Sequence, residues 1–151
     1  MRRVLTALTL LLLTAGTAQA QQWIGLRSGY PLGVTIHYGT ALEAFDLRVS
    51  GRIVAGGDQV RLGLGVDALR TIAREGPLVG YIGAGPAVEI GDDTLVLDVH
   101  ALAGGEFRFT ALDLDALGLF LEGSLGARFG LSGGTAQVPA VGAALGVNWR
   151  F

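Results

Sequence analysis

The sequence predicts an all-β fold in which about eight antiparallel strands form a closed, up-and-down (meander) barrel. Three observations lead to this prediction. Apolar and polar residues alternate with period two over much of the chain after residue 21. Short segments rich in glycine and aspartate separate the alternating stretches. The chain is 50% hydrophobic, with only 16% charged residues and 25 glycines, whereas soluble domains carry about 25% charged residues.

The first 20 residues have the pattern of a secretion signal. Arg2 and Arg3 form a positive start, an apolar core is centred on residues 8–13, and Ala18-Gln19-Ala20 is the small-residue pattern that signal peptidase cleaves. The apolar core is too short for a transmembrane helix, which needs about 20 residues. We therefore expect a cleaved signal peptide over residues 1–20 and an exported barrel over residues 21–151.

Composition also excludes some classes of function. The chain has no cysteine, so disulfides and thiolate metal sites are excluded. All 11 basic residues are arginines, and two of them lie in the expected signal peptide, against 13 acidic residues in the chain. The exported part is therefore acidic, and we expect no nucleic-acid partner.

Alternation is clearest over residues 95–109, where the charged residues occupy even positions only. Period two over this length predicts a strand with one apolar and one polar face. The same pattern recurs in four other segments, which are residues 45–53, 60–66, 117–126 and 141–151. We expect a further strand over residues 78–90, where the many glycines leave the register open and Pro86 predicts a local irregularity.

Residues 22–38 can be interpreted as one strand or as a hairpin. Pro31 has no amide hydrogen for a strand ladder, so a turn over residues 29–32 is chemically reasonable. An even number of strands is also usual in bacterial barrels, and the hairpin interpretation is the one that yields eight. Turns are expected at residues 56–58, 91–93 and 132–134, and longer connections at residues 39–43, 70–76 and 111–116.

Alternation does not by itself say which face points inward. A soluble exported barrel of the lipocalin kind would direct its apolar face inward and bind a small apolar ligand, whereas a membrane barrel directs it outward to lipid. Three features favour a transmembrane barrel surrounded by outer-membrane lipid. The polar face combines glycines with charges of both signs, the chain carries little charge, and Trp149 and Phe151 lie where an interfacial aromatic girdle is expected.

The last seven residues, 145–151, resemble the C-terminal assembly signal of bacterial outer-membrane barrels, which typically ends in phenylalanine. Residues 81–86, 104–109 and 119–122 are also similar to small porin-like barrels of the OmpX and OmpA-transmembrane type. The resemblance implies a location in the outer membrane, no cofactor, and insertion by the barrel-assembly machinery through Trp149 and Phe151. The connections are short for this family, which does not favour an adhesion or receptor role.

The sequence indicates no catalytic, cofactor-binding or metal site. Some eight-stranded barrels are lipid A deacylases with a His-x-Ser pair, but Gly39 and Leu102 stand two residues after His37 and His100. No G-x-S-x-G motif occurs. Because His100 shares the polar face with acidic residues, we interpret it as a member of an ion pair. We therefore expect that the protein is not an enzyme.

The charges on the polar face are expected to pair inside the barrel, because eight strands leave an interior only wide enough for side chains. The predicted members of this ion-pair network are Asp46, Arg48, Arg52, Arg61, Asp67, Asp98, His100, Glu106, Arg108, Glu122, Arg128 and Arg150. The predicted function is a structural or interaction role in the outer membrane, with a lumen plugged by ion pairs. A narrow pore and a soluble lipocalin-like barrel are the alternatives.

Overall fold

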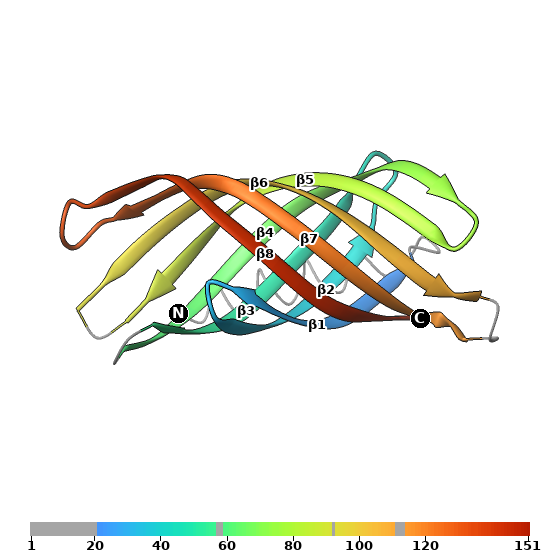
Figure 1. Ribbon diagram of the computed structural model, residues 1–151, viewed down its shortest axis with the longest axis horizontal. Coiled ribbons are helices and arrows are strands. Elements are labelled where there is room, and N and C mark those ends of the chain that lie inside the picture. The colour runs from blue at the N-terminus through green and yellow to red at the C-terminus, as the bar shows by residue number, and fades with distance from the viewer. Residues whose placement is uncertain (1–20, 57–58, 92, 111–113) are drawn as a thin grey trace, which may run out of the picture.

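The computed structural model describes residues 21–56, 59–91, 93–110 and 114–151, and within them it contains eight antiparallel strands. Each strand pairs with the next in the chain, and β1 also pairs with β8, so that the sheet closes into a barrel (Figure 1). The strands are β1 (Gln22–Tyr30), β2 (Gly33–Ala41), β3 (Asp46–Gly56), β4 (Gln59–Glu75), β5 (Leu78–Ile90), β6 (Leu95–Phe109), β7 (Leu114–Gly130) and β8 (Ala136–Arg150). The predicted closed meander barrel is confirmed. The expected signal peptide, residues 1–20, lies outside the described residues.

The hairpin interpretation of the N-terminal segment is confirmed. β1 and β2 have nine residues each and are joined by a turn at Pro31 and Leu32. At the seam, Gln22 and Phe151 exchange two backbone hydrogen bonds, of 3.2 and 2.9 Å. Gln22 and Phe151 lie at the same end of the barrel as the β2–β3 and β4–β5 connections (Figure 1). We call it the terminal end, and we call the opposite end the distal end.

The apolar face of the wall points outward. Leu32 and Leu64 are each 72% exposed, and large aliphatic side chains are exposed on all eight strands. Polar and charged side chains point inward, and Glu89, Asp67 and Arg48 are at most 2% exposed. This is the arrangement expected of a membrane barrel and the reverse of a lipocalin-like barrel. Among the described residues, no helix is long and apolar enough to cross a membrane.

Several strands are longer than the sequence pattern predicts, and β4 and β7 show this at the terminal end. β4 continues to Glu75, so most of the connection expected at residues 70–76 is strand, and β7 begins at Leu114. A β-bulge between Thr71 and Ala73 interrupts the β4–β5 ladder, which is why the alternation stops there. At Pro86 the β5–β6 register is continuous, and the β4–β5 register is the same on both sides of residues 85 and 86. The irregularity predicted at Pro86 is therefore confined to two missing pairs on the β4 side.

Candidate functional site in the lumen

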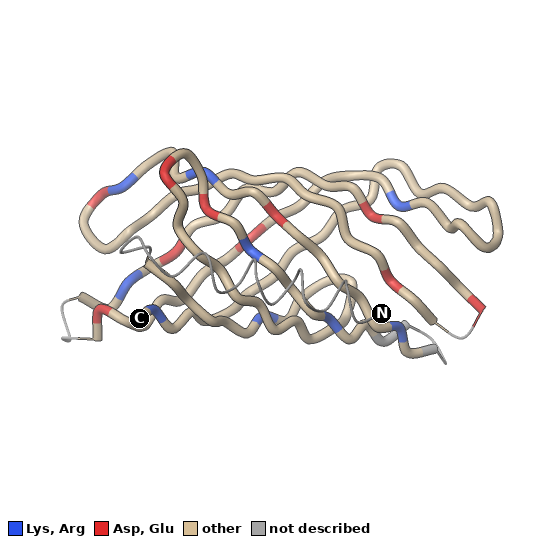
Figure 2. The backbone as a smooth tube through the Cα atoms, turned by 180° about the vertical axis from the view of Figure 1, so that it is seen from behind, with Lys and Arg blue, Asp and Glu red and all other residues tan. Residues whose placement is uncertain are grey.

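The lumen is filled in its middle by charged side chains that approach one another from opposite walls. Figure 2 shows acidic and basic residues distributed along the length of the barrel. Glu122 of β7 forms ion pairs with Arg27 of β1 and Arg48 of β3, and it accepts a 2.8 Å hydrogen bond from the Tyr81 hydroxyl of β5. All four side chains are at least nine-tenths buried. One carboxylate thus joins three strands that are not its neighbours.

A continuous chain of contacts runs from this group to β6. Arg48 also pairs with Asp67 of β4, with its Nε donating to Oδ2 at 3.0 Å. The other oxygen of Asp67 lies 3.1 Å from Nε2 of His100, and Nδ1 of His100 lies 2.7 Å from Asp98. Because both ring nitrogens face carboxylates, the imidazolium form of His100, which has two donors, suits this position.

Glu89 anchors the next group, towards the distal end. Its carboxylate has no exposed surface and receives three arginines. Arg52 lies at 3.1 Å, Arg61 at 3.5 Å, and Arg128 forms a direct hydrogen bond. Arg128 also approaches Asp98 at 3.4 Å, which connects this group to His100. The ion pairs therefore form one chain of contacts from Arg27 to Glu89.

A second group lies near the terminal end. Glu106 of β6 accepts hydrogen bonds from Arg108, at 3.2 Å, from Arg150 and from the side-chain amide of Asn148, at 2.8 Å. The oxygen of that amide lies 2.8 Å from Nε2 of the buried His37. Arg150 also lies over the ring of Trp23, at 5.2 Å from its centroid, in a cation–π contact.

All but one of the residues of the predicted network make ion pairs in the structure; Asp46 makes none within the described part of the chain. Sequence reasoning missed Arg27 and Glu89. Arg27 lies in residues 22–38, which the sequence allowed to be one strand or a hairpin. Glu89 lies in the glycine-rich strand over residues 78–90, for which the sequence predicted no register. A usable signal was parity, because Glu89 is eight residues after Tyr81, and an even separation places both residues on the inner face.

Small and aromatic residues fit the wall around these charges. The ring of Phe120 is 1% exposed and makes an edge contact with His37, with their centroids 5.6 Å apart. A Cβ atom at Gly104 would lie 2.7 Å from the Tyr81 ring and 2.9 Å from Glu122. The close approach of Tyr81 to Glu122 therefore depends on the absence of a side chain at residue 104.

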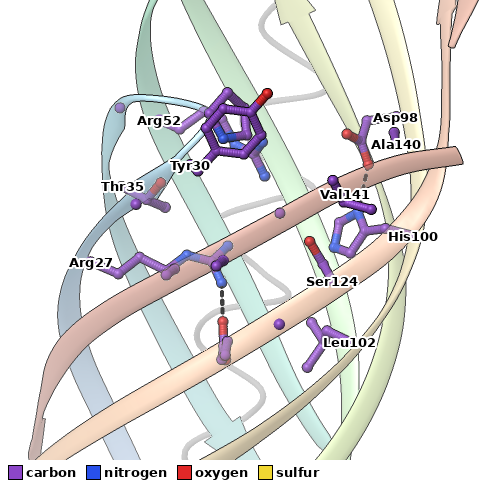
Figure 3. Close-up of a pocket in the computed structure, with 18 of the residues that line it drawn as sticks. Arg27, Tyr30, Thr35, Arg52, Asp98, His100, Leu102, Ser124, Ala140 and Val141 are labelled. Atoms are coloured by element: carbon purple, nitrogen blue, oxygen red, sulfur yellow. Dashed lines mark hydrogen bonds and ion pairs between the residues drawn. The ribbon is translucent and has the colours of Figure 1, made fainter.

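The central charges separate two cavities. The distal cavity, of about 90 Å³, is lined by Arg27, Arg52, His100 and Glu122 among others (Figure 3). The terminal cavity, of about 120 Å³, is lined by residues that include Arg48 and Tyr81. Arg48 and Glu122 therefore lie between the two cavities and face opposite ends of the barrel. Arg27 pairs with Glu122 at the wall of the distal cavity. Figure 3 shows the contact between His100 and Asp98 at the same wall.

The distal cavity also brings together a serine and a histidine. Ser124 lies near His100 in the distal cavity (Figure 3), but both nitrogens of His100 are engaged by carboxylates and neither is free to accept the serine proton. Over the described ranges, no group of histidine and acidic side chains has the geometry to hold a metal ion. Trp149 and Phe151 are 52% and 65% exposed on the outer face, and their role in assembly stays a prediction.

Several solved structures are similar to this chain over 87% of its length. The N-terminal β-barrel domain of Pseudomonas aeruginosa OprF has a TM-score of 0.61 at 18% identity, with 96% of that chain covered. Neisserial surface protein A has a TM-score of 0.56 at 15% identity, with 94% covered. A de novo designed transmembrane β-barrel has a TM-score of 0.50 at 16% identity, with 95% covered. No family model and no curated protein matches the sequence. At these identities the likeness shows the fold, which is that of the small outer-membrane β-barrels.

Proposed function

We propose that this protein is an integral outer-membrane β-barrel with a structural or interaction role, and that ion pairs keep its lumen closed. The proposal rests on the orientation of the two faces of the sheet, which is the reverse of that in a soluble barrel. Buried ion pairs lie inside the barrel, and large aliphatic side chains are exposed on its outer surface. A protein in water that exposed this surface would aggregate, because monomeric soluble proteins rarely expose apolar patches of more than a few hundred Å². A bilayer removes that cost.

Lipid contact also accounts for the pairing of charges inside the barrel. Every backbone polar group within the bilayer has to be satisfied, and a closed barrel does this without an edge. The inner side chains are then shielded from lipid, where an isolated charge would be expensive. The likeness to a designed transmembrane barrel supports the same location. Export by a signal peptide and insertion through the C-terminal strand complete the proposal.

The closed lumen is supported by the position of Arg48 and Glu122. Their pair lies between the two cavities, and both side chains are at least 96% buried. An ion that crossed the barrel would have to displace this pair, together with the Tyr81 hydroxyl and Arg27. We therefore expect no steady conductance, and we place a narrow pore second to a plugged barrel.

The proposed role is also non-enzymatic. To activate Ser124, a ring nitrogen of His100 would have to accept the serine proton. Nε2 of His100 is instead engaged by Asp67, at 3.1 Å. Deacylation of a lipid needs such a base beside a nucleophile. An assay of lipid hydrolysis by the folded protein is expected to show no release of fatty acid.

The test combines cell fractionation with electrophoresis. We expect the protein to pellet with outer membranes, to require detergent for extraction, and to migrate faster in SDS before boiling than after it. Release in the periplasmic fraction without a heat-dependent shift would overturn the membrane proposal.

Conductance tests the second part separately. Protein added to a planar bilayer is expected to produce no steady current. The heat-dependent shift of the same sample in SDS is the control that the protein is folded. Steady single-channel currents from such protein would refute the plug and leave the membrane location standing.

A further inference from the structure

The terminal cavity contains more positive than negative charge. Arg74, Arg108 and Arg150 line it, and the carboxylates among its lining residues are Asp46 and Glu106. Arg48 also lines it, but its guanidinium is held by Asp67 and Glu122. Two of the three other arginines share the single carboxylate of Glu106. Arg74 makes no ion pair within the described residues and is exposed at the mouth of the cavity.

A β-bulge directs Arg74 into this cavity. Before the bulge the odd-numbered residues of β4 face inward, as Asp67 and Leu69 do, and the even-numbered Arg70 is exposed on the outer face. The register shifts between Thr71 and Ala73, and Arg74 then pairs with the buried Val79. Because paired residues share a face, Arg74 points inward although its number is even. Bulges commonly re-aim a side chain in this way beside functional sites.

The three arginines are arranged for an oxygen anion. Arg74, Arg108 and Arg150 line one cavity, so their like charges repel one another there, and an added anion would relieve that repulsion. Arg150 is held between Glu106 and the Trp23 ring, which fixes the orientation of its guanidinium plane. Guanidinium groups present paired donors that match carboxylate and phosphate oxygens. The cavity, at about 120 Å³, has room for several water molecules and hence for a small oxyanion.

We propose that the terminal end of the barrel holds a binding site for an oxyanion, a phosphate or carboxylate group, formed by Arg74, Arg108 and Arg150. The site lies on the terminal side of the central ion pairs, so it is separate from the plug. A ligand reaches it from the aqueous phase at that end without crossing the barrel. Asp46 opposes binding, because its carboxylate carries the same sign as the ligand and faces the same cavity.

Trp23 provides the readout, because it lines the cavity and contacts Arg150. The chain has two tryptophans, so Trp149→Phe leaves Trp23 as the single tryptophan, whose emission is excited selectively at a wavelength that tyrosine does not absorb. This protein is folded in detergent and titrated with sodium phosphate or with sodium acetate, with sodium chloride keeping the ionic strength constant. We expect a saturable change in fluorescence. The anion with the lower Kd identifies the ligand as phosphorylated or as a carboxylate, and either result supports the site.

Three variants in this background decide the assignment. Arg74→Gln is expected to raise the Kd about tenfold, the effect of losing one charge-assisted hydrogen bond. Asp46→Asn is expected to lower the Kd. The matched control is Arg70→Gln, which removes the same charge from the same strand but from the outer face, and it is expected to leave the Kd unchanged.

A heat-dependent shift in SDS confirms that each variant is folded before it is titrated. Absence of a saturable change with either anion would overturn the proposal. An equal rise in Kd for Arg70→Gln and Arg74→Gln would do the same, because net charge alone would then explain the effect.

Discussion

Among the residues that the structure describes, Glu89 is the one carboxylate that pairs with three arginines, and it has no exposed surface. Replacement by alanine leaves Arg52 and Arg61, which are only partly exposed inside the barrel, with no ion-pair partner among the described residues. Removing one partner of a buried pair typically costs about 3–5 kcal/mol, because the remaining charge is left uncompensated. We expect Glu89→Ala to lower the free energy of unfolding by that amount, measured by urea titration of protein folded in lipid vesicles.

The control is Glu75→Ala, at the exposed end of the neighbouring strand β4. It removes the same charge but no ion pair that the structure describes, so we expect a change within about 0.5 kcal/mol. Equal effects of the two variants would show that Glu89 contributes through net charge and not through its three partners.

Gly104 and Gly105 are adjacent in β6 and lie on opposite faces of the wall. A Cβ atom at Gly104 would lie within 3 Å of Tyr81 and Glu122, whereas a Cβ at Gly105 would meet nothing within 4 Å. We expect Gly104→Ala to destabilise the barrel by about 1–3 kcal/mol through overpacking. Gly105→Ala is expected to be neutral or to stabilise by up to about 1 kcal/mol. The same urea titration measures both, and a neutral Gly104→Ala would contradict the described packing.

The sequence predicted the strands well where large apolar and charged residues alternate, as in β6. It predicted them less well where glycine or an outward charge weakens the pattern. Arg70 and the bulge at Ile72 break the alternation of β4, so the strand was expected to end before residue 70. In β5, residues 83–87 are glycine, alanine and proline, which mark neither face. The sequence analysis therefore left the register of that strand open, and with it the role of Glu89.

The bulge makes a testable difference between two deletions in β4. Ile72 has no partner in the β4–β5 ladder, so its deletion leaves every pair of that ladder in place, including Arg74 with Val79. Leu64 is paired with both Gly51 and Val88, and its deletion turns the residues on one side of it to the other face. We expect the protein lacking Ile72 to keep its heat-dependent shift in SDS, and the protein lacking Leu64 to lose it. The opposite result would contradict the described register.

In the whole molecule, the strands differ in length, so the barrel wall is shorter along the axis on one side than on the other. β1 and β2 have nine residues, which span about 23 Å along the axis at a rise of about 3.3 Å per residue and a tilt of about 40°. β4 and β7 have 17 residues, enough for about 43 Å by the same reckoning. Figure 1 shows the taller wall extending past the β1–β2 hairpin at both ends. The short wall limits the thickness of bilayer that the barrel can match.

We therefore expect the barrel to fold more completely into thin bilayers than into thick ones, because mismatch costs a fraction of a kcal/mol per Å. Refolding from urea into vesicles of dilauroyl or dioleoyl phosphatidylcholine, followed by the fraction with the faster migration in SDS, measures this. Equal yields in the two lipids would show that the short wall does not set the hydrophobic height.

The closed barrel and its outward apolar face could be predicted from the sequence, because both follow from period two and composition. The pairing across the lumen could not. Arg27 and Glu122 are 95 residues apart and lie on strands that do not pair with each other. Their contact depends on the register between successive strands around the whole barrel. The alternation of residues within one strand does not determine that register.

The apolar outer face and the charged inner face place different constraints on how this sequence can change during evolution. Outward positions need only remain apolar, so leucine, valine and isoleucine can replace one another there independently of their neighbours. Inward positions are coupled, since a change at Glu89 alters the environment of Arg52, Arg61 and Arg128 together. In descendants of this chain, the outward positions should therefore vary independently of one another, whereas the inward positions should covary. The buried inward residues should also change more slowly than the outward ones.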